Sequence, residues 1–305
     1  SDTGNSSYGT AIVGTVSGTS ISFGTAVVYN SSGISDSGVT FDSTNNKVVI
    51  AYQHNTNSNY GTAIVGTVSG TAISFGTDVV FETASVASVA ATFDSANNKV
   101  VIAYKDEGNS SYGTAIIGTV SGTAISFGTA AVFEAASTTY ITATFDSNAN
   151  KVAIAYKDNG TTYGTAVVGT VSATSISFGT AVVFETASVN YLTATFDSSS
   201  NRVVISYTDA GNSSHGTSIA GTISGTSISF GTPVVFEATS TTYITATFDS
   251  VNNKTVTAYQ NSATYGSAVV SNIPNLLTIG TDYFVQGDGS LSTTSSTVPA
   301  GRALT

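Results

Sequence analysis

The sequence predicts an all-β protein, a β-propeller of four-stranded antiparallel blades, and three observations lead to this fold. A unit of about fifty residues recurs: ISFGT begins at 21, 73, 125, 176 and 228, and FDS begins at 41, 93, 145, 196 and 248. Each unit contains four short runs rich in Val, Ile, Thr, Tyr and Phe, separated by turn residues and without a helical period. Four strands in this length are typical of a propeller blade, because a solenoid coil is shorter and a sandwich domain is longer.

The unit around residue 190 shows the elements in order. In NYLTATFDS the side chains alternate between two faces, with Leu192, Ala194 and Phe196 on one of them. This pattern predicts the inner strand. The turn DSSSN leads to RVVISY as the second strand, and the loop TDAGNSS leads to HGTSIAGTI as the third. The turn SGT then leads to SISFGTPVVFE as the fourth strand, and ATSTT opens the next unit.

The spacing of the units predicts six blades in one domain that covers residues 1–305. Five blades are predicted at 34–82, 86–134, 138–185, 189–237 and 241–286. In the fifth blade, LLTIGTDYFVQ at 276–286 matches the fourth strand of the other units. The sixth blade is split between the termini, with two outer strands from 1–30 and two inner strands from 287–305. Such closure removes free sheet edges, which otherwise favour aggregation.

Composition argues against several classes of function. The 305 residues carry a net charge of −10, from 18 acidic and 8 basic residues, which argues against nucleic acid and anionic membrane surfaces as partners. Without Cys there are neither disulfides nor thiolate metal sites, and no apolar stretch is long enough to insert into a membrane. Because oxidisable Cys, Met and Trp are all missing, we expect a virion or extracellular location.

The aspartates of the FDS motif are interpreted as turn residues. They are Asp42, Asp94, Asp146, Asp197 and Asp249. An Asp at the start of a tight turn caps the backbone two residues further on, whereas calcium needs several oxygen ligands and DSTNNK offers one carboxylate. His54 and His215 fall in the first and fourth blades, so they form no catalytic pair. We therefore expect no metal and no cofactor.

Differences between the units predict which face carries the function. The DSxNN and VSGT turns hardly vary, whereas loops such as QHNTNSN, KDEGNSS and KDNGTT vary and share one face, called here the variable-loop face. Tyrosines and carboxylates gather at the strand ends of this face, where they favour binding of a sugar or a protein, although solvated strand ends with weak ion pairs are the alternative interpretation. The candidate ligand-binding residues are Tyr140, Tyr191, Tyr243, Asp36, Glu82, Glu134, Glu185, Glu237, Asp106, Asp158 and Asp209.

Two stretches resemble a known family. The repeats, of the form GTAVVFETASVNYLTATFDS and NRVVISYTD, are similar to those of predicted propellers in virion and tail-fibre-like structural proteins of marine bacteriophages. Within 276–305, LTIGTDYFVQGDGSLSTTSSTVPAGRALT resembles a C-terminal segment of phage tail fibres, of the form G-x-x-Y-x-V-Q-x-D-G-x-L-S-T-T with a later A-G-x-A-L. The resemblance implies a virion protein present in multiple copies, and it assigns no catalytic residue.

The sequence therefore favours a non-enzymatic phage virion structural or adhesion module, of tail-fibre or receptor-binding type, that recognises a cell-surface glycan or another virion protein. A purely architectural spacer and a secreted bacterial lectin-like propeller are the non-enzymatic alternatives. The enzymatic alternative is a glycoside hydrolase that uses two acids in the funnel of the propeller. Against it, Asp36 is the only acid expected at the mouth of the funnel.

Overall fold

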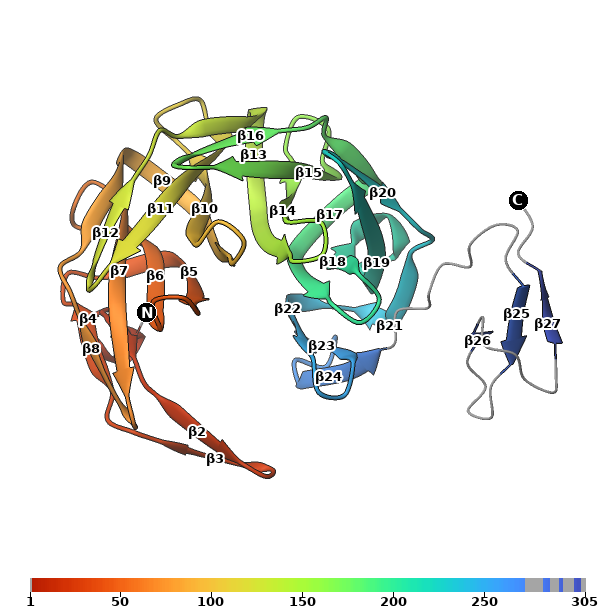
Figure 1. Cartoon of the computed structure of the whole chain (residues 1–305), viewed down its shortest axis with the longest axis horizontal. Coiled ribbons are helices and arrows are strands. Elements are labelled where there is room, and N and C mark those ends of the chain that lie inside the picture. The colour runs from red at the N-terminus through yellow and green to blue at the C-terminus, as the bar shows by residue number, and fades with distance from the viewer. Residues whose placement is uncertain (1, 272–281, 286–290, 293–298, 303–305) are drawn as a thin grey trace. The chain divides into compact units, whose positions relative to one another are not determined.

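Figure 1 shows the computed structural model of the chain, and the structure describes residues 2–271, 282–285, 291–292 and 299–302. These residues form β-strands throughout, with two short 3₁₀ turns, η1 (Thr3–Asn5) and η2 (Ala210–Asn212), and without an α-helix. None of the described residues belongs to a helix long and apolar enough to cross a membrane. The all-β propeller fold predicted from the sequence is confirmed.

The first complete blade shows how the strands pair. Its strands are β5 (Ile34–Asp42), β6 (Lys47–His54), β7 (Tyr60–Ser69), β8 (Ala72–Phe75) and the first part of β9 (Val79–Asp94). The first three pair in antiparallel order, and the outer edge of β7 is paired by β8 at one end and by β9 at the other. The second part of β9 then pairs with β10 as the inner strand of the next blade. One continuous strand thus links two blades.

The same order continues along the chain (Figure 1). The second blade adds β10 (Lys99–Asp106), β11 (Tyr112–Ser121), β12 (Ala124–Phe127) and the first part of β13 (Ala131–Asp146). The third adds β14 (Lys151–Asp158), β15 (Tyr163–Ser172), β16 (Ser175–Phe178) and the first part of β17 (Val182–Asp197). The fourth adds β18 (Arg202–Asp209), β19 (His215–Ser224), β20 (Ser227–Phe230) and β21 (Val234–Ser240). The fifth is described by β22 (Thr242–Asp249), β23 (Lys254–Gln260) and β24 (Gly266–Ser271).

The N-terminal residues form only outer strands. These are β1 (Gly9–Ala11) paired with β4 (Val27–Asn30), and β2 (Gly14–Ser17) paired with β3 (Ser20–Phe23). Ala11 and Tyr29 pack against the apolar cluster of the first blade around Ile34 and Tyr52. This arrangement repeats that of the third and fourth strands of a blade.

Residues 272–305 form a second compact unit, whereas the sequence predicts a single domain from 1 to 305. The described part of this unit is a sheet in the order β26 (Leu291–Ser292), β25 (Asp282–Val285), β27 (Pro299–Arg302). The predicted fourth strand of the fifth blade, 276–286, lies outside the described residues apart from β25, whose partners are β26 and β27. Most of 287–305 also lies outside the described residues, so the six-blade count stays a prediction.

The core lies between consecutive blades rather than inside each blade. In each cluster, small side chains of one blade pack against larger side chains of the blade that follows it in the chain. The fully buried residues between the first two blades include Val49, Ala51, Ala63, Val65, Val100, Ile102 and Tyr104. Burial of such side chains contributes roughly 1.5–3 kcal/mol each, which makes these contacts the main source of stability.

The positions between the fourth and fifth blades carry hydroxyl groups instead. Ser206 and Ser218 stand where the first three blades have Ala, and Thr255 and Thr257 stand where they have Val or Ile. The Ser206 and Ser218 hydroxyls are 2.7 Å apart and hydrogen-bonded. The buried Thr255 hydroxyl has no hydrogen-bond partner in the described part of the chain. An unpaired buried hydroxyl is destabilising, so Thr255 reduces the stability gained from packing against the fifth blade.

The glycine of the repeated ISFGT phrase allows neighbouring blades to approach closely. A Cβ atom built on Gly128 would lie 1.8 Å from the carbonyl oxygen of Thr174, in the turn of the next blade. The equivalent distances are 1.9 Å at Gly24, 2.1 Å at Gly76 and 1.9 Å at Gly179. No side chain fits at these positions, which explains why this glycine recurs in the repeat.

We expect Gly128→Ala to lower the free energy of unfolding by about 1–3 kcal/mol, because the added methyl group forces the backbone of the next blade to move. Denaturant titration followed by circular dichroism measures this change. Gly266→Ala is the matched control, since a Cβ there meets nothing within 4 Å. Its effect should stay within about 0.5 kcal/mol. Equal destabilisation by both substitutions would contradict the close approach of the blades.

Candidate functional site

The five inner strands share a bulge near the variable-loop face. The residues at the bulge have φ angles between +40° and +52°, and the strand register shifts beside each of them. They are Asp36, Ser88, Tyr140, Tyr191 and Tyr243, called here the bulge row. A bulky residue in this left-handed region is strained by roughly 1–3 kcal/mol. Bulges of this kind re-aim side chains and are common beside functional sites.

The tyrosines of the bulge row contact one another. The ring centroids of Tyr140 and Tyr191 are 5.4 Å apart, and those of Tyr191 and Tyr243 are 5.1 Å apart. Adjacent rings are tilted by 51° and 53°, within the range of favourable aromatic pairs. The Tyr243 side chain remains 69% exposed. Desolvation, assisted by the other two tyrosines, raises the pKa of Tyr140, so its phenol stays protonated at neutral pH.

The other end of the bulge row is polar. The carboxylate Oδ2 of Asp36 accepts a hydrogen bond of 2.9 Å from the backbone N–H of Ser88, which lies 52 residues further along the chain. The inner strands therefore follow one another in space as they do in the chain. The fold brings Tyr140, Tyr191 and Tyr243 into contact, whereas Asp36 is hydrogen-bonded to Ser88, so a single site that contains all four candidate residues stays a prediction. Sequence analysis did not identify the bulge, since Tyr is not a residue that favours positive φ.

Lys157 lies on the strand beside the bulge of Tyr140, where it pairs with Thr139. Its ammonium donates hydrogen bonds to Ser188 Oγ at 3.0 Å and to Asn190 Oδ1 at 3.1 Å. Burial lowers the pKa of this ammonium. Both acceptors lie on β17, where it passes from the third blade (Ser188) into the inner strand of the fourth (Asn190, next to Tyr191), so this lysine links two blades.

The four candidate glutamates hold the blades together. Each accepts a hydrogen bond from the phenol of a tyrosine in the next blade, in the pairs Tyr104–Glu82 (3.1 Å), Tyr156–Glu134 (2.8 Å), Tyr207–Glu185 (3.2 Å) and Tyr259–Glu237 (3.0 Å). The first three tyrosines are fully buried. Burial and the nearby carboxylate raise the pKa of each tyrosine. The structure thus gives these glutamates an internal role, and ligand binding by them stays a prediction.

The loop aspartates of the candidate site also have internal partners. Asp106 Oδ1 accepts the backbone N–H of Asn109 at 3.1 Å, and Asp158 Oδ1 accepts that of Gly160 at 2.8 Å. Asp209 Oδ1 accepts the N–H of Gly211 at 2.9 Å and caps η2. Burial, together with the Glu185 carboxylate, raises the pKa of Asp209. The three carboxylates order their own loops, so a direct contact with a ligand again stays a prediction.

The FDS aspartates cap turns, as the sequence indicates. Asp42 Oδ1 accepts the backbone N–H groups of Thr44 and Asn45 at 3.0 and 2.9 Å. The same pair of bonds occurs at Asp94, Asp146, Asp197 and Asp249. Among the described residues no three His, Cys, Asp or Glu side chains come close enough to hold a metal ion.

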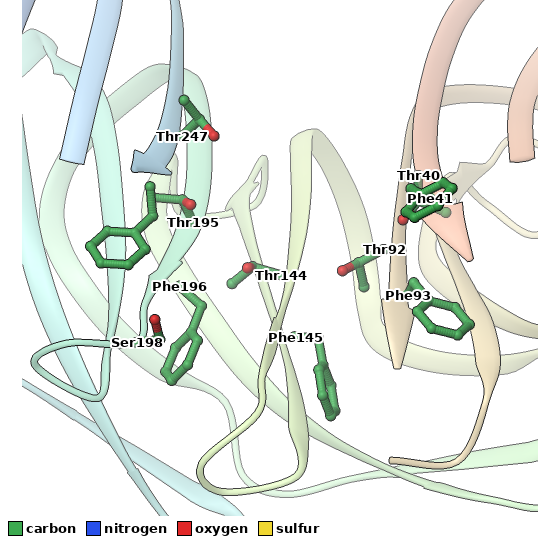
Figure 2. A pocket seen from close by; sticks show the side chains of 11 residues that line it. Thr40, Phe41, Thr92, Phe93, Thr144, Phe145, Thr195, Phe196, Ser198 and Thr247 are labelled. Atoms are coloured by element: carbon green, nitrogen blue, oxygen red, sulfur yellow. The ribbon is translucent and has the colours of Figure 1, made fainter. Parts of the chain in front are cut away.

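Two cavities occur besides the bulge row, one at the other end of the inner strands and one that reaches Tyr243 from the fifth blade. One, of about 380 Å³, is lined by threonines and phenylalanines at the FDS ends of the five strands and contains no charged group (Figure 2). The other, of about 600 Å³, lies beside Tyr243, Ala258 and Ala268 of the fifth blade. Equivalent alanines in the first three blades are buried by the blade that follows. We therefore interpret the second cavity as space for a blade rather than as a ligand pocket.

No protein-family model matches the chain, and no curated protein is similar to it. Solved structures are similar at low sequence identity. AofleA from Arthrobotrys oligospora has a TM-score of 0.57 at 9% identity, over 93% of this chain and 78% of that one. The SapL1 lectin in complex with α-methyl fucoside has a TM-score of 0.52 at 13% identity, over 98% of this chain and 97% of that one. An exo-β-1,3-galactanase from Phanerochaete chrysosporium has a TM-score of 0.50 at 10% identity, over 82% of this chain and 68% of that one.

Enzymes that act on sialic acids are also similar, but this chain spans only 57% of the length of a Hadza microbial sialidase and 43% of a leech intramolecular trans-sialidase. The sequence identities of all these structures to this chain are low, so these similarities establish the fold alone. They nevertheless contradict the predicted phage virion structural or adhesion module, because the similar structures are carbohydrate-acting enzymes and lectins. That prediction is wrong because it relied on repeats and a C-terminal motif. Both indicate a similar fold, and neither identifies a binding site.

We expect Tyr243→Gly to maintain or raise the free energy of unfolding, by up to about 1 kcal/mol, because glycine adopts the positive φ of 52° without strain. The ring is largely exposed, and loss of its tilted contact with Tyr191 offsets only part of this gain. Tyr243→Ala is the control, since it also removes the ring but keeps the strained backbone. Urea unfolding should place the Gly variant about 1 kcal/mol above the Ala variant. Equal stability of the two variants would show that the bulge is not strained.

Proposed function

We propose that the protein is a carbohydrate-binding propeller that holds a glycan on the bulge row. The observation that carries this proposal is the row of three contacting tyrosines in left-handed backbone conformations. Glycine, Asn or Asp would fit such positions with less strain, so the backbone conformation does not explain why tyrosine occurs here. Functional sites are where a protein retains strained residues of this kind.

The chemistry of these side chains suits sugars. A tyrosine ring presents an apolar face to the C–H groups of a pyranose, and its hydroxyl exchanges hydrogen bonds with those of the sugar. Nearby amide and hydroxyl groups, such as those of Asn190 and Ser188, already make hydrogen bonds in fixed positions. The structural likeness to a lectin in complex with a fucoside supports the same class of ligand.

A glycoside hydrolase is the second candidate, because the galactanase and the trans-sialidase have similar folds. Hydrolysis generally needs two carboxyl groups, about 5 Å apart for retention and further apart for inversion. Asp36 is the only carboxylate in the bulge row, and the four glutamates are hydrogen-bonded to tyrosines. The buried Tyr104, Tyr156 and Tyr207, each hydrogen-bonded to a glutamate, are also unsuited to act as the tyrosine nucleophile that sialidases use, because they are 0% exposed.

Replacing the three tyrosines of the bulge row by serine should weaken glycan binding at least tenfold, since each aromatic contact contributes about 0.5–1.5 kcal/mol. Serine is the chosen substitute because Ser88 occupies the same bulge position in the second blade. A glycan array followed by calorimetry on its strongest ligand measures the effect. Tyr265→Ser is the control, as this 71% exposed tyrosine is not in the row. Unchanged binding by a folded triple variant would show that the site lies elsewhere, and no binding by the native protein would refute carbohydrate binding.

The hydrolase candidate is tested on a panel of neutral and acidic oligosaccharides, with release of reducing ends as the measurement. Under the binding proposal we expect no release above that of a heat-denatured sample. If hydrolysis does occur and Asp36 is the catalytic acid or base, Asp36→Asn should reduce its rate by about 10²–10⁴-fold. Such a reduction, in a folded variant, would replace the binding proposal by the enzymatic one.

A further inference from the structure

The surroundings of the bulge row are acidic. Asp106, Asp158 and Asp209 pair across the ladder with Val86, Thr138 and Val189, each of which lies two residues before a bulge residue. Glu82, Glu134, Glu185 and Glu237 precede the bulges of the next blade in the chain, and Glu107 follows Asp106 in the same loop. A ligand that approaches the row therefore meets a negative potential.

The cations at these strand ends already have partners. Lys105 forms an ion pair of 3.3 Å with Glu107, and Lys157 is hydrogen-bonded to Ser188 and Asn190. Within the described residues, the inner-strand bulges carry one carboxylate, Asp36, and no cation. An acidic sugar would be repelled here, because its charge would find no available ammonium or guanidinium group.

The bulge row itself favours positive charge. The face of a tyrosine ring attracts an ammonium group, by about 0.5–2 kcal/mol depending on exposure. Asp36 uses Oδ2 for the backbone of Ser88, which leaves Oδ1 without a partner among the described residues. A carboxylate oxygen with a fixed orientation forms strong hydrogen bonds with an ammonium donor. The tyrosine faces and the oriented Asp36 carboxylate lie in one row, and both favour binding of a cation.

We propose that the glycan bound on the bulge row carries protonated amines, as glucosamine oligosaccharides do, with sugar rings against the tyrosines and an ammonium group near Asp36. This inference rests on the proposed carbohydrate binding and narrows it to a ligand class. It also distinguishes this chain from similar folds that act on sialic acids, whose carboxylate has the opposite charge.

The test compares four probes with the native chain by calorimetry in low salt. They are the β-1,4-linked hexamers of glucosamine, of N-acetylglucosamine and of glucose, and an oligogalacturonate. The glucosamine hexamer should bind roughly tenfold more tightly than the two neutral hexamers, because it alone adds ammonium contacts. The oligogalacturonate should not bind. In about 0.5 M salt the advantage of the amine should shrink, since added salt screens exposed charges.

Two variants locate the effect. Asp36→Asn should reduce the ratio of the affinity for the glucosamine hexamer to that for the neutral hexamers about threefold to tenfold. Asp249→Asn is the control, because it removes the same charge from the far end of an inner strand, and an Asn there can still cap the turn. The control should maintain the preference within about twofold, as expected for a substitution remote from the site.

The outcomes separate the two proposals. If no hexamer binds, carbohydrate binding and the amine preference are both wrong. If the neutral hexamers bind as tightly as the glucosamine hexamer, only the amine preference is wrong. If the preference survives in the triple tyrosine-to-serine variant, or if hexalysine competes as well as the glucosamine hexamer, the attraction is general and the inference of an amine-bearing glycan is overturned.

Discussion

Packing between consecutive blades is the interaction on which the rest of the structure depends. A single blade has two apolar faces and cannot bury either of them alone, so its stability comes from its neighbours. Three features keep adjacent blades in one relative position: small residues facing large ones, a glycine with no room for a side chain, and a phenol hydrogen-bonded to a glutamate of the preceding blade. Each feature occurs once per repeat, so the same geometry is generated several times along the chain.

This regularity also creates the candidate site. Because the blades are equivalent, equivalent residues of the inner strands lie side by side. Where the residue type differs between blades, the chemical character of the bulge row therefore changes along its length. The row changes from Asp36 and Ser88 to three tyrosines. The repeat supplies the positions, and the differences between repeats supply the chemistry. Stability and function are therefore carried by different residues of the same strands.

The carboxylates of the variable-loop face show why residue type alone does not assign a role. Asp36 and Glu82 both lie at strand ends on that face, and both appear as candidate ligands in the sequence. In the structure Asp36 is exposed in the bulge row, whereas Glu82 accepts a hydrogen bond from the buried phenol of Tyr104. The partner of Glu82 is 22 residues away in the chain and in another blade. No local pattern distinguishes the two acids, since only the packing of blades brings that partner close.

The sequence by itself determined the fold class, the strand order within each repeat and the capping role of the FDS aspartates. These features depend on local periodicity and on turn chemistry, both of which are contained in a few consecutive residues. Repeat equivalence also predicts that Tyr140, Tyr191 and Tyr243 lie side by side, as they do in the structure. Only the tertiary structure decided that these residues are at strained bulges, that the glutamates hold neighbouring blades together, and that β25 pairs with β26 and β27. Each of these features depends on contacts between segments that are distant in the chain. Local sequence patterns do not predict such contacts.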